Sequence, residues 1–484
     1  MTATTEAATA PSRTTPALLS GTAVAIVLAL STFKGLTPFT EPDLWWHLRT
    51  GDRLRDGVGL VAPDPSAGLA AHDYVATQWL PEVTASWAYS WGGAGAILWL
   101  RCAAIVMLVT AVYLLGRRYA GRLPSAVAAG LTLIAAGGGL NPRPQLISFV
   151  LFAAVLHGWL AMLKDRRPRW WLIPVFWGWA MCHGLWMFGL VVGAAVIGVD
   201  MLERRERWTR AEVRRAGALW LLCAFAVAAT PLGPRLLAAP FDVAHNALTV
   251  ADEWRPTPMN NVFSWAAVLE VLLCVWLWSR PSARGRVRTR HWWELVLLAF
   301  ATFCILWMWR LVPLGAVAAA PLVAAAIQDR LTGRREPFSR HERSRLALAV
   351  AALLAVAAVL CTTGVGAQSA RYPGDVRAID SALGQLPRGS VVLDDFGISG
   401  WLLWRHPELV PAADLRGEIY DRSYLEDYEH ALAAEPGWQD YLRQIDARAA
   451  LVASDSAIAA ALTDRLGWTV RARSSAFVLL TPRT

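Results

Sequence analysis

The stretch Glu41-Pro42-Asp43-Leu44-Trp45-Trp46-His47-Leu48 directly follows the first long hydrophobic run of the chain. It holds two acids, two tryptophans and a histidine, and its position after an apolar run places it at a membrane surface. Carboxylates can move protons or hold a metal ion, and tryptophan faces suit both sugar rings and the bilayer interface. A second interpretation is a helix start, with Thr40 as the N-cap and the Asp43 side chain reaching back to the Thr40 N–H. The stretch alone leaves both interpretations open.

The composition is that of a membrane protein. The chain has 484 residues, is 55% hydrophobic and contains 26 Trp. Apolar runs of about 18 or more residues repeat along it, which indicates a polytopic α-helical membrane protein. The net charge of +9 does not indicate nucleic acid as a partner, because the arginines lie in short clusters between the apolar runs. We predict about eleven spans, at residues 17–33, 93–115, 123–140, 146–163, 170–182, 185–202, 216–230, 263–279, 294–310, 311–327 and 346–364.

The arginines also set the expected orientation of the chain. By the positive-inside rule, loops rich in arginine are cytoplasmic. Residues 1–16, which are rich in Thr and Ala, then form a disordered cytoplasmic N-terminus. The odd number of spans puts everything after about residue 365 on the outside. The arginine-rich loops lie near residues 117–122, 164–169, 204–215, 280–290 and 330–345.

The loop at 34–92, which we call the outer loop, belongs to a transmembrane domain expected at 17–364. It is too long for a plain connector. Its pattern predicts two amphipathic helices at the membrane interface, near 41–56 and 78–91, joined by a turn-rich segment. Interfacial anchoring is expected from Trp45, Trp46, Trp79, Trp87 and Trp91.

The segment 371–484, which we call the tail domain, has a different character. Short strands alternate with helices that have charged faces, which predicts a small extracytoplasmic α/β domain with its own core. The expected strands are 390–396, 408–415 and 449–453, the expected helices are 399–405, 424–434 and 456–466, and a hairpin joins 468–473 to 476–480.

Polar residues near the predicted outer surface are the candidates for function. Charges at membrane depth are expensive and therefore suggest a role, and arginine is suited to grasp a phosphate through its planar fork of donors. The candidates are Glu41, Asp43, His47, Gln78 and Glu82 in the outer loop, Arg101 in the second span, Asn141 to Gln145, His183, Asp252 to Pro256, and Arg310.

Structural interpretations compete with these roles. Arg101 would only extend its charged end to the interface, Arg143 would cap the third span, and His183 would bond a backbone carbonyl. Glu270 and His157 lie within spans, and we interpret both as hydrogen-bonded or packing residues. The six cysteines lie in or beside apolar runs without CxxC or Cys/His spacing, so we expect small buried hydrophobic residues and neither a disulfide framework nor a zinc site.

One span, a large outer loop that starts with an acidic motif, further spans and an outer α/β domain together resemble the GT-C superfamily of membrane glycosyltransferases. The resemblance implies that an acid of the first outer loop acts as a base or a metal ligand. It also implies a polyprenyl-phosphate-linked sugar as donor, transfer outside the membrane, and an extracytoplasmic glycan, lipid or protein as acceptor.

More narrowly, the motifs resemble those of a poorly characterised group of bacterial membrane proteins, which implies a multi-pass protein of the bacterial plasma membrane. Two positions depart from that group. Thr77-Gln78 stands where the group usually has an acid or His before Trp79, and Leu415 stands where it usually has Gly; either departure implies an altered acceptor or lost activity. The matching motifs are Glu41 to Gly51, Trp79-Leu80-Pro81-Glu82, Arg143-Pro144-Gln145-Leu146, His183-Gly184, Glu253-Trp254-Arg255-Pro256, Leu393-Asp394-Asp395-Phe396, and Asp414-Leu415-Arg416 through Tyr420.

The mechanism that this resemblance implies is an inverting transfer with Asp43 and Glu41 as catalytic residues. Asp43 would take the proton from an acceptor hydroxyl, or orient it, as the sugar C1 leaves the lipid phosphate. A divalent cation could be shared by Glu41 and Asp43 with His47 or Glu82. Arginine would neutralise the leaving phosphate. The implied substrate-binding residues are Trp46, His47, Glu82, Arg101, Arg143, Gln145, His183, Trp254, Arg255 and Arg310.

Two other classes of function stay open. A transporter or flippase of lipid-linked sugars explains the arginines and spans equally well, although such proteins often have repeated halves and this chain shows no internal repeat. A non-catalytic assembly protein would bind polysaccharide through its outer domain. For a transferase, we expect the tail domain to hold no catalytic residue, with Asp394, Asp395 and Arg416 fixing its loops or touching an acceptor.

Overall fold

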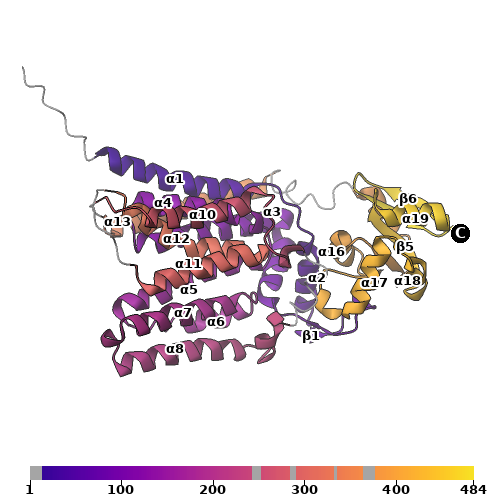
Figure 1. Cartoon of the computed structure of the whole chain (residues 1–484). Coiled ribbons are helices and arrows are strands. Elements are labelled where there is room, and N and C mark those ends of the chain that lie inside the picture. The colour runs from indigo at the N-terminus through magenta and orange to yellow at the C-terminus, as the bar shows by residue number, and fades with distance from the viewer. Residues whose placement is uncertain (1–13, 242–251, 284–289, 332–334, 364–375, 484) are drawn as a thin grey trace, which may run out of the picture.

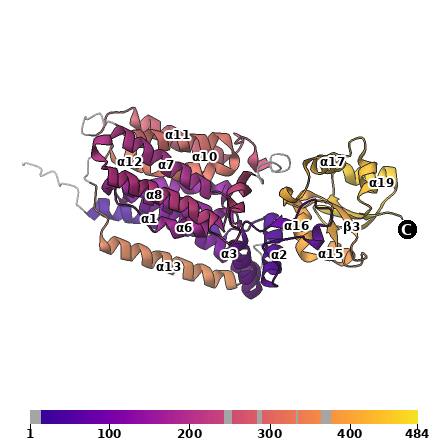
Figure 2. The same ribbon diagram turned by 90° about the horizontal axis from the view of Figure 1, so that it is seen from below.

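A bundle of long helices and a small α/β domain at one of its ends make up the molecule (Figure 1). The computed structural model describes residues 14–241, 252–283, 290–331, 335–363 and 376–483. The outer loop lies between the bundle and the α/β domain, and the second view shows the same order (Figure 2). The predicted fold class, a helical membrane protein with a small C-terminal sheet region, is confirmed. The disorder predicted for 1–16 falls mostly outside the described residues.

Each predicted span coincides with a helix of the bundle. Six helices of the described part are long and apolar enough to cross a membrane, by length and composition, and two further apolar helices are shorter. The number of eleven spans and the sidedness stay predictions. The helices are α1 (Thr14–Leu36), α3 (Trp79–Arg117), α4 (Arg122–Ala135), α5 (Gln145–Asp165), α6 (Leu172–Ala180), α7 (Trp186–Glu203), α8 (Arg210–Ala228), α10 (Val262–Trp278), α11 (Trp292–Trp307), α12 (Val312–Gln328) and α13 (Arg340–Thr362).

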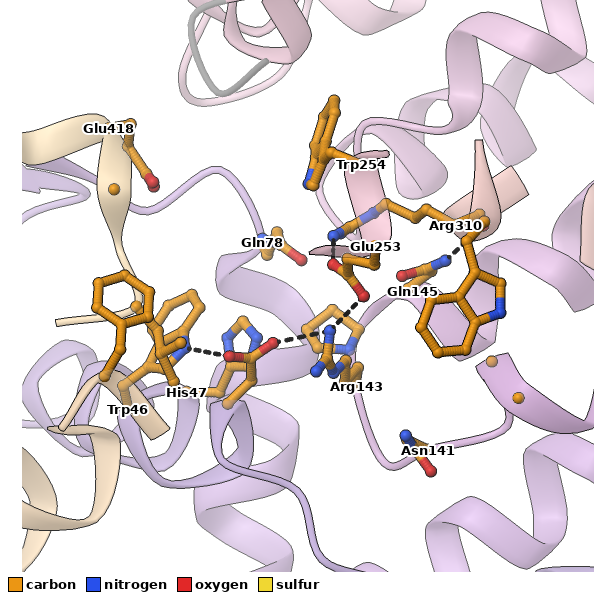
Figure 3. Close-up of a pocket in the computed structure, with 18 residues that line it drawn as sticks. Trp46, His47, Gln78, Asn141, Arg143, Gln145, Glu253, Trp254, Arg310 and Glu418 are labelled. Atoms are coloured by element: carbon orange, nitrogen blue, oxygen red, sulfur yellow. Dashed lines mark hydrogen bonds and ion pairs between the residues drawn. The ribbon is translucent and has the colours of Figure 1, made fainter. Parts of the chain in front are cut away.

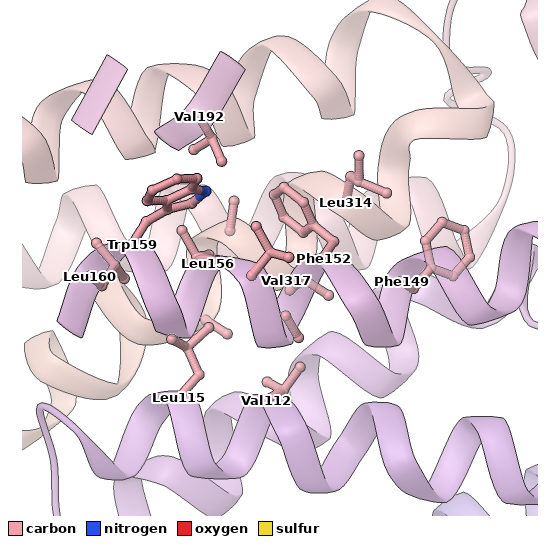
Figure 4. Close-up of a cluster of buried hydrophobic side chains, with 14 of the residues drawn as sticks. Val112, Leu115, Phe149, Phe152, Leu156, Trp159, Leu160, Val192, Leu314 and Val317 are labelled. Atoms are coloured by element: carbon pink, nitrogen blue, oxygen red, sulfur yellow. The ribbon is translucent and has the colours of Figure 1, made fainter. Parts of the chain in front are cut away.

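Small residues let the central helix α12 pack closely against α4, α10 and α11. A Cβ on Gly315 would lie only 2.7 Å from the carbonyl oxygen of Ala301 in α11. Larger side chains of α5, above all Phe152 and Trp159, fill the space between α3, α7 and α12 (Figure 4). The six cysteines are all buried and free, as predicted.

A kink at Gly93 divides α3 into two parts. Gly93 has φ 55° and ψ −145°, a conformation that a residue with a Cβ rarely adopts. The kink separates the predicted interfacial helix from the predicted second span. Trp87 and Trp91 of the first part are exposed and stack on each other with ring centroids 4.8 Å apart. Their exposure fits the predicted interfacial anchoring.

Helix α2 (Asp43–Arg55) carries the opening motif, and two expectations about it were wrong. Thr40 is exposed and is not the N-cap, because Pro42 takes that place and Glu41 Oε1 accepts the Asp43 N–H at 3.3 Å. Trp45 and Trp46 are both buried, so they do not anchor the outer loop in a bilayer. The outer loop also contains the two-stranded sheet of β1 (Val61–Ala62) and β2 (Tyr74–Val75), with the 3-10 helix η1 (Pro65–Ala67) between them.

The tail domain is built on a five-stranded sheet in the order β4-β3-β5-β7-β6. Strand β3 is parallel to β4 and β5, whereas β7 is antiparallel to β5 and β6. Most predicted elements are present, while α15 and α18 were not predicted. The elements are α15 (Arg377–Leu383), β3 (Val391–Asp394), α16 (Phe396–Arg405), β4 (Val410–Pro411), η6 (Gly417–Ile419), α17 (Arg422–Leu432), α18 (Trp438–Gln444), β5 (Ala447–Ala453), α19 (Ala457–Leu466), β6 (Thr469–Arg473) and β7 (Phe477–Thr481).

The predicted strand 408–415 is reduced to the two residues of β4. The chain turns away there because buried Asp394 accepts the backbone N–H groups of Ala412 and Ala413, at 2.8 and 3.4 Å. Asp395 accepts the Gly397 N–H at 2.9 Å and so caps α16. Both acids therefore fix loops, which is one of the two roles expected for them.

Arg416 joins the tail domain to the outer loop. Its guanidinium bonds Asp414 Oδ2 at 2.7 Å within the tail domain and Asp64 Oδ2 at 2.7 Å in the outer loop. Helix α16 also rests on the start of α2, where a Cβ on Gly400 would lie 2.7 Å from the Pro42 carbonyl oxygen. This packing buries Trp46 and holds one face of the tail domain against the opening motif.

Candidate functional site

A cavity of about 390 Å³ lies where the outer loop, the bundle and the tail domain meet (Figure 3). Its lining is rich in charged and aromatic side chains, which come from segments far apart in the sequence. The residues that line it are Asp43, Trp46, His47, Gln78, Gly138, Gly139, Asn141, Arg143, Pro144, Gln145, Glu253, Trp254, Trp309, Arg310, Phe396, Leu415, Gly417 and Glu418.

Arg143, in the turn before α5, binds three carboxylates. Its guanidinium lies 2.8 Å from Glu41 Oε1, 3.0 Å from Asp43 Oδ2 and 2.8 Å from Glu253 Oε2. Burial works against its charge, but the neighbouring carboxylates hold the pKa of Arg143 above its ordinary value. Arg143 is therefore a permanent cation at the centre of the cavity wall, held in place from three sides.

Glu41 lies behind this cation rather than in the cavity. Its side chain is 1% exposed. Burial raises the pKa of Glu41 to about 7, although Arg143 pulls it the other way. The protonation state of Glu41 is therefore expected to change near neutral pH, and with it the net charge around Arg143.

Arg310, in the 3-10 helix η5 (Trp309–Leu311), supplies a second cation. It bonds Glu253 Oε1, and its other terminal nitrogen lies 2.9 Å from His183 Nε2. Its guanidinium lies over the Trp254 ring, 5.3 Å from the centroid. Burial, and then the Arg310 charge, lower the pKa of His183 well below its usual range, so His183 is neutral. Glu253 thus links the two arginines.

His47 connects the cavity to a fully buried acid. Its Nδ1 lies 2.9 Å from Oε1 of Glu82, whose side chain is 0% exposed. The Tyr74 hydroxyl donates to the same oxygen at 3.3 Å. The Trp46 ring lies against the imidazole, with centroids 3.6 Å apart. Packing and hydrogen bonding together fix the orientation of the His47 ring.

Most of the residues predicted for the site gather here. Asp43, Trp46, His47, Arg143, Gln145, Trp254 and Arg310 line the cavity, and Glu41, Glu82 and His183 bond residues that line it.

Two predicted substrate-binding residues lie elsewhere. Arg101 is buried and donates to the carbonyl oxygens of Leu140, at 2.7 Å, and Thr37, at 2.8 Å, so it ties loops together. Arg255 is exposed and does not line the cavity. The bond expected from His183 to a backbone carbonyl does not form. Its Nδ1 instead accepts the Leu185 N–H at 3.2 Å.

The guanidinium of Arg143 lies against both Glu41 and Asp43, the two acids predicted to share a cation. Among the residues that the structure describes, no group of three or more His, Cys, Asp or Glu side chains is arranged to hold a metal ion. A bound divalent cation stays an untested prediction.

Sequence reasoning gave four lining residues no role in the site. Asn141 and Glu253 were only among the polar candidates, and Phe396 and Glu418 stood only within matching motifs. Glu253 stands within a motif that had been noticed, but only the fold shows that it faces two arginines. Glu418 comes from η6 of the tail domain and lines the cavity opposite the bundle. Burial raises the pKa of Glu418 to about 7. Glu418 lies within the motif Asp414 through Tyr420, but only the fold shows that it faces residues of the outer loop and the bundle, which come much earlier in the chain.

An apolar groove of about 280 Å³ adjoins the cavity. The start of α7, residues 236–241 and the join of α11 and α12 form its walls, mostly with apolar side chains such as Trp186 and Phe241. Gln78, Trp254 and Arg310 line both the groove and the cavity. Arg310 therefore stands where an apolar space meets a polar one.

No protein-family profile and no curated protein sequence matches the chain. Several solved structures, in contrast, superpose on the chain. The apo oligosaccharyltransferase of Archaeoglobus fulgidus superposes with a TM-score of 0.54 at 13% identity, over 89% of this chain and 69% of that one. ArnT from Cupriavidus metallidurans superposes with a TM-score of 0.51 at 14% identity, over 96% and 98%. Both are GT-C proteins.

This chain has the GT-C fold. A further structure with that fold, the Archaeoglobus fulgidus oligosaccharyltransferase AglB, was solved with an inhibitory peptide and a dolichol-phosphate, and superposes with a TM-score of 0.53 at 12% identity, over 89% of this chain and 69% of that one. At such identities the likeness concerns the GT-C fold alone. The narrower resemblance to the bacterial group with the opening motif stays a prediction.

Proposed function

We propose that this chain is a membrane glycosyltransferase that moves a sugar from a polyprenyl-phosphate donor to an acceptor on the side of the tail domain. The observation that carries the proposal is the position of Arg310, which lines both the apolar groove and the charged cavity. A lipid phosphate has the same two parts, an apolar chain and an anionic head. The groove would take the first isoprene units, and the cavity would take the phosphate and the sugar.

The two arginines suit the leaving phosphate. Charge builds on the phosphate oxygen as its bond to the sugar C1 breaks, and fixed cations in a partly buried site stabilise that charge. Arg143 and Arg310 are held in place through Glu253, so little reorganisation is needed. Incoming phosphate would compete with Glu253 for both guanidinium groups.

Asp43 lies beside this cationic wall. Its Oδ2 contacts Arg143, and Trp46 Nε1–H donates to its Oδ1 at 3.3 Å. We assign Asp43 the task of holding Arg143 and accepting a hydrogen bond from the acceptor hydroxyl, which keeps that oxygen in line with the sugar C1. Glu41 supports the same cation from behind.

The acceptor would approach between the outer loop and the tail domain. Trp46 offers a ring face for a sugar, and Phe396, Leu415 and Glu418 bring tail-domain side chains into the cavity. The tail domain thereby contributes side chains to the cavity, but not the three that were expected to fix its loops or touch an acceptor, Asp394, Asp395 and Arg416. The AglB complex with a dolichol-phosphate adds support for the donor class through the shared fold.

The test uses purified protein in liposomes, host membranes that lack this chain as the acceptor source, and polyprenyl-phosphate glucose, galactose, mannose and arabinose supplied one at a time. Release of free polyprenyl phosphate is measured by lipid mass spectrometry. This release requires cleavage of the sugar–phosphate bond, so it separates a transferase from a flippase and from a non-catalytic assembly protein. We expect release from one of these donors, and no release from any of them contradicts the proposal.

Arg310→Gln should reduce the release by about 10²–10³-fold, because a fixed cation at the developing charge is lost. Arg255→Gln is the matched control, since Arg255 is exposed, lies outside both the cavity and the groove, and comes from the neighbouring motif. It should stay within about threefold of the native rate, as expected for a surface change. Equal losses in the two variants would contradict the role of Arg310.

A further inference from the structure

His47 bonds a buried acid through Nδ1, one face of its ring lies against Trp46, and its side chain lines the cavity. An imidazole that donates its Nδ1–H to a carboxylate carries its lone pair on Nε2. Glu82 is such a carboxylate, and the Tyr74 hydroxyl donates to the oxygen that lies beside His47 Nδ1. His47 Nε2 is therefore the ring nitrogen that remains to accept a proton from a molecule in the cavity.

The other carboxylates at the centre of the cavity already have partners. Asp43 bonds Arg143 and the Trp46 indole, and Glu253 bonds Arg143 and Arg310. A proton that arrived on either carboxylate would have to displace one of these charge-assisted contacts. His47 Nε2 takes up a proton without such a loss, and the resulting imidazolium gains an ion pair with Glu82.

Resting on the transferase function proposed above, we propose that His47 is the proton acceptor of the reaction and that Glu82 positions it. The acceptor oxygen forms a bond to the sugar C1 as the bond from C1 to the phosphate oxygen breaks. The hydroxyl proton passes to His47 Nε2, and the electron pair of the broken bond stays on the polyprenyl phosphate beside Arg143 and Arg310. Asp43 orients the hydroxyl and keeps its own contacts.

Other titratable groups face His47 from the elements around it. Asp43 lies on the same helix, Arg143 and Glu418 line the same cavity, and His183 lies close enough to sense its charge. His183 has both ring nitrogens engaged, by Leu185 and Arg310. Glu418 is the one competitor for the proton among these groups, and the test compares it with His47 directly.

The test is the release assay above, run over a range of donor concentrations that reaches saturation, with variants of the full chain at His47, Glu82, Glu418 and His72. His47→Asn places an amide nitrogen where Nδ1 lies, so it keeps a donor for Glu82 but offers no basic nitrogen. We expect its kcat to fall by about 10²–10⁴-fold with thermal stability retained. Glu82→Gln should lower kcat with little change in KM, because it disturbs the orientation of the imidazole and not donor binding.

Chemical rescue separates a base from a packing residue. His47→Ala leaves room for a small molecule, and imidazole added to the assay should restore release, with a rate that rises with basicity across a series of methylated imidazoles. His72→Asn is the control, because His72 is exposed and pairs with Asp421 outside the cavity. It should keep the native rate and respond to no imidazole.

Three results would overturn the inference: a His47→Asn protein that keeps more than a third of the native kcat, a rescue that does not depend on basicity, or a Glu418→Gln loss larger than that of His47→Asn. Release by the native chain together with a His47→Asn kcat above a third of the native value counts against His47 alone. No release by the native chain from any donor overturns the transferase proposal as well.

Discussion

Arg143 and Arg416 are both clamped by carboxylates, but Arg416 is buried and Arg143 is only partly buried and lines a cavity. Asp414 binds Arg416 through two oxygens, at 2.9 and 2.7 Å, and Asp64 binds its remaining end, so every side of the guanidinium is occupied. Its side chain is 1% exposed. Arg143 contacts three carboxylates and still leaves 22% of its side chain exposed.

The difference teaches what separates a structural cluster from a candidate site. Around Arg416, each charge is paired with an opposite charge inside the protein, and no donor nitrogen of the guanidinium is left for a ligand. Around Arg143, Glu253 is shared with a second arginine, so an incoming anion finds two cations and one protein carboxylate to replace. Both clusters consist of arginine and carboxylates. What distinguishes them is the cavity beside Arg143, which gives a ligand room to bind.

Arg416, Asp414 and Asp64 form a cluster with no room for a ligand, which we call the closed cluster. The largest effect is expected from removing its arginine. Arg416→Leu leaves Asp64 and Asp414 as buried carboxylates without their common partner, which should cost about 3–5 kcal/mol of stability. Thermal unfolding and limited proteolysis in detergent would show the tail domain released from the outer loop. Arg448→Leu is the control, because its pair with Asp446 is exposed and should contribute little. Similar unfolding of the two variants would contradict the role given to Arg416.

Asp43→Asn should instead affect transfer far more than stability. Asn keeps an oxygen for the Trp46 indole but loses the charge that holds Arg143, so we expect release of polyprenyl phosphate to fall by about 10²–10³-fold. The cost in stability should be only about 1 kcal/mol. A well-folded Asp43→Asn protein with normal release would return Asp43 to a structural role in α2.

The smallest effect is a pH dependence of stability above about pH 4.5, which only the open cluster of Arg143, Glu41, Asp43 and Glu253 shows. The pKa of Glu41 is about 7 in the folded chain, whereas its ordinary value is 4.5. Between these two pH values the folded state therefore holds a proton that the unfolded state has lost. Stability should therefore fall as pH rises from about 4.5 to about 7 and level off above. In the closed cluster, burial opposes the charge of Asp64, but Arg416 lowers its pKa, so stability there is lost only below about pH 4.

Glu41→Gln should flatten the slope of melting temperature between pH 5 and pH 7 by roughly half. It does not abolish the slope, because Glu418, also raised to about 7, contributes with the same sign. Native and variant proteins with identical slopes would show that Glu41 is ionised throughout this range.

Hydrophobic patterning predicted the helices well because a membrane span is a local property. A run such as the one at 146–163 has few alternatives to a buried helix, and α5 covers it. The order of the spans places the acidic motif, Arg143 and Arg310 at the same end of the bundle. Their proximity could therefore be predicted from the sequence. The kink at Gly93 falls between the interfacial helix predicted at 78–91 and the span predicted at 93–115.

The errors came from contacts between distant segments. Thr40 looked like a helix cap, but Pro42 takes the cap position and Glu41 accepts the Asp43 N–H. Trp46 looked like a membrane anchor because nothing nearby in sequence shows that α16 covers it. Arg101 was read as a phosphate ligand or an interfacial charge, but two carbonyl groups from other loops bind it. Burial by distant segments cannot be read from a residue's own neighbourhood.

The contact between Arg416 and Asp64 can form only late in the synthesis of the chain. The two residues are 352 positions apart, and a ribosome adds roughly 5–20 residues per second, so the outer loop waits about 20–70 s for its partner. Arg53 lies 2.9 Å from Asp64 and can neutralise it in the meantime. The cavity gains its last wall only when η6 has been made, so a nascent chain would be unable to carry out the proposed transfer before that point.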